Sequence, residues 1–131
     1  FGGHRNGAFY EPTVLTHITP EMDVAKDLEI FGPVFSIISI ESAEEAVQVA
    51  NQSRYGLSGA VFSENSKLAL SIAERLETAT VVINGGTDYR PPELAFGGYK
   101  KSGIGREGVS RTLDEMTQEK NYVLKNIFGN L

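Results

Sequence analysis

Cysteine is absent from this 131-residue chain, and histidine occurs only twice, as His4 and His17. The lack of cysteine excludes disulfides and thiolate metal ligands. Two histidines do not favour a histidine-built zinc site, so no metal site is expected. Because both histidines lie close to the N-terminus, the sequence does not favour a Ser-His-Asp catalytic set either.

The chain also lacks long apolar runs and a strong basic cluster. No run approaches the roughly 20 apolar residues that a membrane helix needs. No signal peptide is visible, because the chain opens on Phe1-Gly2-Gly3-His4-Arg5. The net charge is -5, and the one basic cluster, Lys100-Lys101 with Arg106, is interrupted by glycines. We therefore expect a cytoplasmic protein with neither a nucleic-acid nor a membrane partner.

Hydrophobic residues make up 40% of the chain and charged residues 22%, which is typical of a globular protein. The length predicts one domain with a real core. The first residue is Phe1, not Met, and it stands within a glycine-rich phrase. We therefore expect residues 1–131 to be a single fragment of a longer chain.

Three apolar segments are predicted to be strands, namely Val34 to Ile40, Gly59 to Ser63 and Thr78 to Ile83. Helical patterns lie between them, and the connections are short. This order is typical of a parallel sheet with crossover helices. The fold class expected is therefore α/β with a βαβαβ core buried on both faces. Ligands gather at the carboxyl ends of such strands, where Asn84-Gly85-Gly86 follows the third one.

Local signals place both helices. The first is expected to begin at a capping box, with Ser42 as the N-cap and Glu45 reaching back. Asn65 can cap the second helix. The apolar stripe of that helix is predicted to consist of Leu68, Ile72 and Leu76.

The N-terminal region is expected to be less regular. Phe1 to Gly7 is rich in glycine and should be poorly tied down. Ala8 to Leu15 is predicted to be an extended or edge strand around Pro12. Pro20 is expected to begin a short helix.

A turn of defined shape is predicted at Gly32-Pro33, in the stretch Leu28-Glu29-Ile30-Phe31-Gly32-Pro33-Val34. It should expose Glu29 and Phe31, and a rigid turn is a good place to hold two side chains against a ligand. The alternative is an ordinary turn before a strand, with a solvated Glu29 and a core Phe31.

Thr87 to Arg106 forms a long loop without periodicity, and a loop of that length in a compact domain is usually functional or disordered. Its Gly103-Ile104-Gly105 follows a loop and has no third glycine at the dinucleotide-binding spacing, so we expect glycines that allow tight packing. Arg90 could contact an anionic ligand or be an exposed structural residue. Glu107 could simply complement a helix dipole.

After this loop, Val109, Leu113 and Met116 give an apolar stripe at helical spacing. Asn121 to Ile127 is predicted to be a final strand without a partner in the chain. It could pair with another subunit.

Several phrases resemble the NAD(P)-dependent aldehyde dehydrogenases in the right order. Glu29-Ile30-Phe31-Gly32-Pro33-Val34 resembles the family's EIFGPV, and Glu11-Pro12-Thr13-Val14-Leu15 resembles its EPTVL. Ala50-Asn51 with Tyr55-Gly56-Leu57 resembles AN…YGL, and Phe96 to Glu107 resembles the loop FGGxKxSGxGRE. Leu28 departs from the many members that have a second acid before the matching glutamate.

The resemblance implies oxidation of an aldehyde to a carboxylic acid with NAD or NADP. A catalytic cysteine attacks the aldehyde to give a thiohemiacetal, hydride passes to the nicotinamide, and a glutamate-activated water hydrolyses the thioester. The resemblance covers only the C-terminal part of the catalytic domain. The cysteine, the general-base glutamate and the Rossmann-type cofactor domain precede it, so this fragment alone is expected to be inactive and to contain no catalytic residue of the main steps.

The same resemblance suggests supporting roles for residues present here. Glu29 matches the residue whose carboxylate accepts hydrogen bonds from the nicotinamide ribose, and Phe31 matches the aromatic packed on it. Phe96 matches the aromatic at the mouth of the aldehyde pocket, and Arg90 lies in the loop that varies with substrate. Glu107 matches a position implicated in proton movement.

The final strand, 121–127, resembles a segment that joins a neighbouring subunit, so a homo-oligomer is expected. Arg90 with Lys100 and Lys101 could favour an acidic aldehyde such as a semialdehyde. Two alternatives stay open: a non-catalytic α/β interaction module derived from this fold, and an enzyme that passes the thioester to coenzyme A.

Overall fold

The N-terminal part of the chain consists of two small strand pairs. The computed structural model describes residues 1–125. An antiparallel hairpin joins β1 (Arg5–Asn6) to β2 (Phe9–Tyr10). The next strand, β3 (Thr13–Leu15), pairs in parallel with β4 (Val34–Ser36).

The N-terminus is tied to this region, so the prediction that Phe1 to Gly7 is poorly held is wrong. The terminal ammonium of Phe1 donates to the carbonyl of Val14 over 3.0 Å, and the amide of Val14 donates back over 2.9 Å. The expected extended segment from Ala8 to Leu15 is present as β2 and β3. The short helix exists as one 3-10 turn, η1 (Asp23–Ala25), so it begins three residues after Pro20.

The first α-helix, α1 (Ala43–Asn51), begins at the predicted N-cap. Ser42 Oγ accepts from the amide of Glu45 over 3.1 Å, which satisfies one free N–H of the first turn. The carboxylate of Glu45 reaches back, but it accepts from the amide of Glu41 over 2.7 Å, one residue earlier than a capping box requires.

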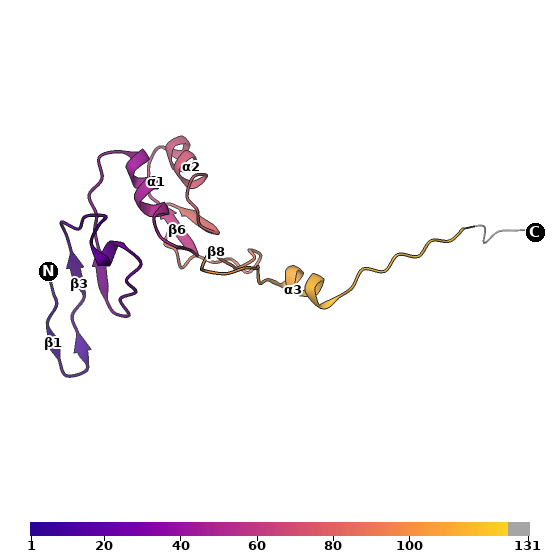
Figure 1. The fold of residues 1–131 in the computed structure, drawn as a ribbon, viewed down its shortest axis with the longest axis horizontal. Helices are drawn as coiled ribbons and strands as arrows, with labels where there is room; N and C mark the ends of the chain where they lie inside the picture. Colours follow the sequence, from indigo (N-terminus) through magenta and orange to yellow (C-terminus); the bar gives the residue numbers. More distant parts are fainter. Residues whose placement is uncertain (126–131) are drawn as a thin grey trace, which may run out of the picture.

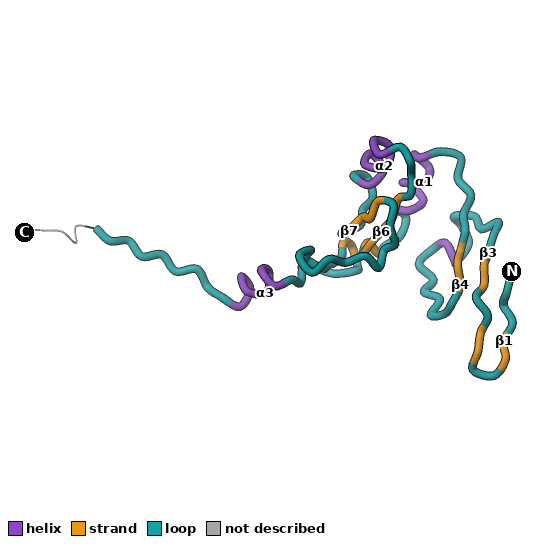
Figure 2. Tube along the Cα trace, turned by 180° about the vertical axis from the view of Figure 1, so that it is seen from behind, coloured by secondary structure: helices purple, strands orange, loops and turns teal. Residues whose placement is uncertain are grey.

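A strand-helix-strand unit follows α1 and contains two of the four buried apolar residues within residues 1–125, Val61 and Ala69. It consists of β6 (Ser58–Val61), α2 (Ser66–Ala73) and β7 (Thr80–Ile83). The two strands are parallel, and α2 packs on both of them (Figure 2). As predicted, Asn65 caps α2, because its Oδ1 accepts from the amide of Leu68 over 3.1 Å.

The buried face of α2 differs from the predicted stripe by about one residue. Ala69 is fully buried, whereas Leu68 remains 43% exposed. The side chains on the inner face of α2 and the turn that follows it are Ala69, Ile72, Ala73 and Leu76. The small residue at 69 lets the helix approach the strands, and the larger Leu68 lies at the edge of the contact.

The α/β class and the parallel pairing agree with the sequence, but the strands do not form one three-stranded sheet. Within residues 1–125, β4 pairs with β3, and β6 pairs with β7. The strand expected from Val34 to Ile40 ends at Ser36, and Ile40 is 43% exposed. β3 is short because Pro12 precedes it without an N–H and His17 turns the chain in the left-handed region (φ 56°).

The loop that was expected to be long is partly ordered by short pairings. β5 (Tyr55–Gly56) pairs antiparallel with β8 (Tyr99–Lys100), and Phe96 pairs with Glu107. After it comes α3 (Val109–Met116). In Figure 1 β1 and β3 lie at one end of the described chain, with α3 and residues 117–125 on an arm at the other.

The predicted final strand is not seen over residues 121–125, and residues 126 and 127 lie outside the described part. A strand needs a hydrogen-bonded partner, and no segment of residues 1–125 runs beside it. Among the helices of this part of the chain, none is long and apolar enough to cross a membrane. No group of three or more potential metal ligands occurs within residues 1–125.

Candidate functional site

The turn at Gly32-Pro33 presents Glu29 and Phe31 outward. The amide of Gly32 donates to the carbonyl of Ile30, and the amide of Val34 donates to that of Gly32, each over 2.8 Å. Two such tight bonds in succession fix the backbone just before β4. Phe31 is 96% exposed, which excludes the alternative of a core phenylalanine within this chain.

Glu29 lines a cavity of about 400 Å³, together with four residues from three segments of the chain. These four are Asp27, Leu28, Tyr55 and Ser102. The Glu29 carboxylate has no hydrogen bond or ion pair with another residue of the described part (1–125). It is therefore available to accept hydrogen bonds from a ligand.

Arg90, Phe96 and Glu107 lie close together in the structure. The backbones of Phe96 and Glu107 exchange two hydrogen bonds of 2.7 and 2.6 Å. The Arg90 guanidinium lies 4.1 Å from the centre of the Phe96 ring, a cation–π distance. Phe96 and Glu107 line a second cavity of about 320 Å³, which shares Ser102 with the first.

Glycines make this loop tight, but of the two for which a packing role was predicted, Gly103 and Gly105, only Gly103 is closely packed. A Cβ at Gly97 would clash with the carbonyl of Gly105, and one at Gly98 would clash with Ser102. Gly103 is also closely packed, whereas a Cβ at Gly105 would meet nothing within 4 Å. The tight packing therefore rests mainly on Gly97 and Gly98.

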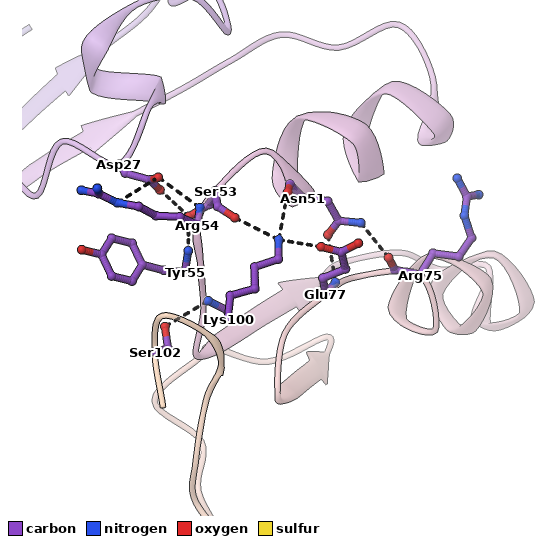
Figure 3. A network of polar contacts seen from close by, with 10 residues as sticks. Asp27, Asn51, Ser53, Arg54, Tyr55, Arg75, Glu77, Lys100 and Ser102 are labelled. Atoms are coloured by element: carbon purple, nitrogen blue, oxygen red, sulfur yellow. Dashed lines mark hydrogen bonds and ion pairs between the residues drawn. The ribbon is translucent and has the colours of Figure 1, made fainter. Parts of the chain in front are cut away.

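A polar network joins the segment that carries Asp27 and Glu29, residues 27–34, to the turn after α1 (Figure 3). The Asp27 carboxylate accepts a short hydrogen bond from Ser53 Oγ and a bond of 3.1 Å from the amide of Arg54. The Arg54 Nε lies 3.6 Å from the same carboxylate. The Ser53 hydroxyl, followed by the Arg54 amide, holds the pKa of Asp27 below its usual range.

Lys100 binds the same turn from the β8 side (Figure 3). Its Nζ donates to the carbonyls of Asn51 and Ser53 over 2.9 Å each and lies 2.7 Å from Glu77 Oε2. Because three acceptors surround its ammonium, Lys100 is not available to a substrate. The prediction that it helps to bind an acidic aldehyde is wrong.

Ser102 and Asn51 complete the network. Ser102 Oγ accepts from the amide of Gly56 over 3.0 Å. The Asn51 side chain donates to the carbonyl of Arg75 over 2.8 Å and accepts from the amide of Glu77 over 2.9 Å, which joins the ends of α1 and α2. Sequence reasoning missed Asp27, Ser53 and Ser102, because their partners lie 26 to 46 residues away.

Comparison with known proteins identifies the family. The profile of the aldehyde dehydrogenase family matches residues 1–122, so the chain belongs to that family. A lactaldehyde dehydrogenase from Methanococcus maripaludis is 39% identical over 126 residues, which are 96% of this chain and 27% of that protein. This confirms the resemblance and the α/β fold class.

Two solved structures are similar as well. An NAD-dependent aldehyde dehydrogenase from Sinorhizobium meliloti has a TM-score of 0.82 and 43% identity, and the match covers 90% of this chain and 24% of that one. Aldehyde dehydrogenase 21 from Physcomitrella patens, solved with the reaction product succinate, has a TM-score of 0.86 and 37% identity, with coverage of 100% and 27%. The chain thus spans about a quarter of the length of its relatives.

Proposed function

We propose that this chain is the C-terminal part of the catalytic domain of a longer aldehyde dehydrogenase, which oxidises an aldehyde to a carboxylic acid with NAD or NADP. Membership of the family and the quarter-length match to its members support the proposal. The chain has no cysteine, so the nucleophile must come from the part of the parent that the family places before it.

The observation that carries the proposal is that Glu29 lines a cavity, with no partner for its carboxylate within residues 1–125, and is followed two residues later by the exposed Phe31. A carboxylate accepts hydrogen bonds from the two hydroxyls of a ribose, and an exposed aromatic ring can pack on the sugar. These residues fit the nicotinamide ribose. When bound, NAD(P) supplies the hydride acceptor, and the role of Glu29 and Phe31 is to orient it.

A carboxylate-bearing aldehyde is the substrate class that Arg90 favours. The face of its guanidinium is covered by the Phe96 ring at 4.1 Å, which leaves the N–H edge to bind an anion in two-pronged fashion. Within residues 1–125 Arg90 has no ion-pair partner. The succinate bound by the Physcomitrella patens relative is an anion of this kind.

The test compares succinate semialdehyde with the neutral butanal in an NAD(P)-coupled assay of the parent enzyme. Arg90→Met should raise KM for succinate semialdehyde about tenfold and leave KM for butanal unchanged. The control is Arg111→Met, on α3. Equal changes for both aldehydes would contradict the substrate class, and no NAD(P) reduction with any aldehyde would contradict the proposed reaction.

We further propose that the parent is a cytoplasmic homo-oligomer that associates through residues 121–127. Tyr122, Val123 and Leu124 are 72% exposed or more, which supports a contact there. Glu107 lines the second cavity, and its part in proton movement stays a prediction.

A further inference from the structure

The turn 51–55, which runs from the last residue of α1 to the first residue of β5, is bound from two sides by segments that are distant in sequence. From one side the amide of Arg54 donates to Asp27 over 3.1 Å. From the other side the carbonyl of Arg54 accepts from the amide of Lys101 over 3.0 Å. The N–H of Arg54 thus binds the segment that carries Glu29, and its C=O binds the loop that carries Phe96.

Asp27 is the contact on the Glu29 side, two residues before Glu29 itself. Its side chain is 16% exposed and receives hydrogen bonds from Ser53 and Arg54. Its backbone lies in the left-handed region, with φ 57°. That conformation costs free energy in a residue with a side chain, so the surrounding contacts must hold it.

Lys100 is the contact on the Phe96 side, four residues after Phe96. Its side chain is 24% exposed, and its ammonium has three acceptors, two of them carbonyls at the end of α1 and in the turn. Its φ of 51° also lies in the left-handed region. A lysine that binds carbonyls at a helix C-terminus is an ordinary cap. Capping alone does not explain why the segment of Asp27 binds the same turn from the other side.

The two anchored segments carry the residues that face the two cavities. Glu29 follows Asp27 and lines the first cavity, and Phe96 precedes Lys100 and lines the second. Ser102, which holds the amide of Gly56, lines both. Both segments are bound to the turn 51–55, so the distance between the side chains that line the first cavity and those that line the second depends on this turn.

We propose that Asp27 and Lys100 are positioning residues. Asp27 ties the cofactor-facing loop, residues 27–34, to the turn 51–55, and Lys100 ties the substrate-facing loop, residues 96–107, to the same turn. Together they set the distance between the two loops. The roles of the two loops rest on the proposed function, but the anchoring does not. Small displacements of groups that orient reactants are costly in an active site. Loss of one anchor should therefore affect the ligand on its own side.

The kinetic test uses the parent enzyme with two matched pairs of variants. Lys100→Met should raise KM for the aldehyde about tenfold with a smaller change in KM for NAD(P), whereas Asp27→Asn should raise KM for NAD(P) more than that for the aldehyde. Lys67→Met, at an exposed position on α2, and Glu21→Gln are the controls, and neither should change either KM. Lys100→Arg keeps the charge, so its KM for the aldehyde should be close to the wild-type value.

Hydrogen–deuterium exchange of the same proteins tests the anchoring without relying on activity. Lys100→Met should speed exchange in residues 96–107, and Asp27→Asn should speed it in residues 27–34. If Lys100→Met does not fold, Lys100→Asn replaces it, because asparagine suits the left-handed backbone but cannot reach the carbonyls.

Exchange unchanged in both loops would overturn the proposal, whether or not the parent oxidises aldehydes. A lower unfolding temperature with both KM values unchanged would also overturn it. Faster exchange in a parent that shows no aldehyde activity would support the anchoring and contradict the proposed function instead.

Discussion

At the scale of single residues, the site depends on which polar groups are committed to the fold and which are left for a ligand. The carboxylate of Asp27 and the ammonium of Lys100 are engaged by backbone and side-chain partners. The carboxylate of Glu29 and the guanidinium edge of Arg90 have no such partner within residues 1–125. This difference separates residues of similar type into positioning and binding roles.

Glu29→Gln should raise KM for NAD(P) in the parent enzyme by about tenfold or more. The amide keeps the shape of the side chain but loses the charge, and hydrogen bonds to a charged group contribute about 1.5–3 kcal/mol. Steady-state kinetics measures the change. Glu64→Gln, on the loop before α2, is the control and should match the wild type. Equal KM values in both variants would contradict the role of Glu29.

The lowered pKa of Asp27 predicts a stability difference that depends on pH. Because its folded pKa lies below the unfolded value of about 4, the Asp27 contacts stabilise the protein above that pH and are lost as the pH falls through the folded pKa. Asp27→Asn should therefore be less stable than the wild type at pH 7, and the two unfolding temperatures should converge below about pH 4. A difference that stays constant with pH would contradict the assignment.

At the scale of elements, local signals were sufficient for the caps of α1 and α2 and for the strands β6 and β7, but not for the length and partner of β4. Ser42 and Asn65 could be predicted as caps because each bonds an amide three residues away. The partner of β4 could not be predicted, because pairing depends on β3, whose length is limited by Pro12 and His17.

The residues of the candidate site also differ in whether local signals or distant contacts determine their role. Glu29 and Phe31 could be predicted as exposed, because the Gly32-Pro33 turn that presents them is local. The role of Lys100 could not, because the carbonyls it binds lie 47 and 49 residues away in sequence.

The loop 96–107 should tolerate alanine at Gly105 but not at Gly98. A Cβ at Gly98 would clash with Ser102, whereas one at Gly105 would lie in open space. Gly98→Ala should reduce the free energy of unfolding by about 1–3 kcal/mol, the usual cost of overpacking. Chemical denaturation of both variants measures this. Similar losses in the two variants would contradict the packing of the loop.

At the scale of the whole molecule, this chain leaves many apolar side chains in solvent. Its buried apolar residues are few: Ile18, Val47, Val61 and Ala69 in residues 1–125. On α3, Val109, Leu113 and Met116 are at least 62% exposed. Apolar surface of this extent is typical of an interface with other protein segments.

The isolated 131-residue chain should therefore self-associate. Sedimentation velocity at high micromolar concentration should show species larger than 14.2 kDa. Leu113→Glu should weaken the association if α3 takes part, and Glu115→Gln on the same helix is the control. A single monomeric species for the unaltered chain would contradict this prediction.

The most direct test of the account is the mass of the natural protein, combined with an NAD(P)-coupled aldehyde assay on it. We predict a mass several times 14.2 kDa and aldehyde-dependent reduction of NAD or NADP. A natural protein of about 14 kDa without turnover would contradict the account, and the chain would then be a non-catalytic module with the aldehyde dehydrogenase fold.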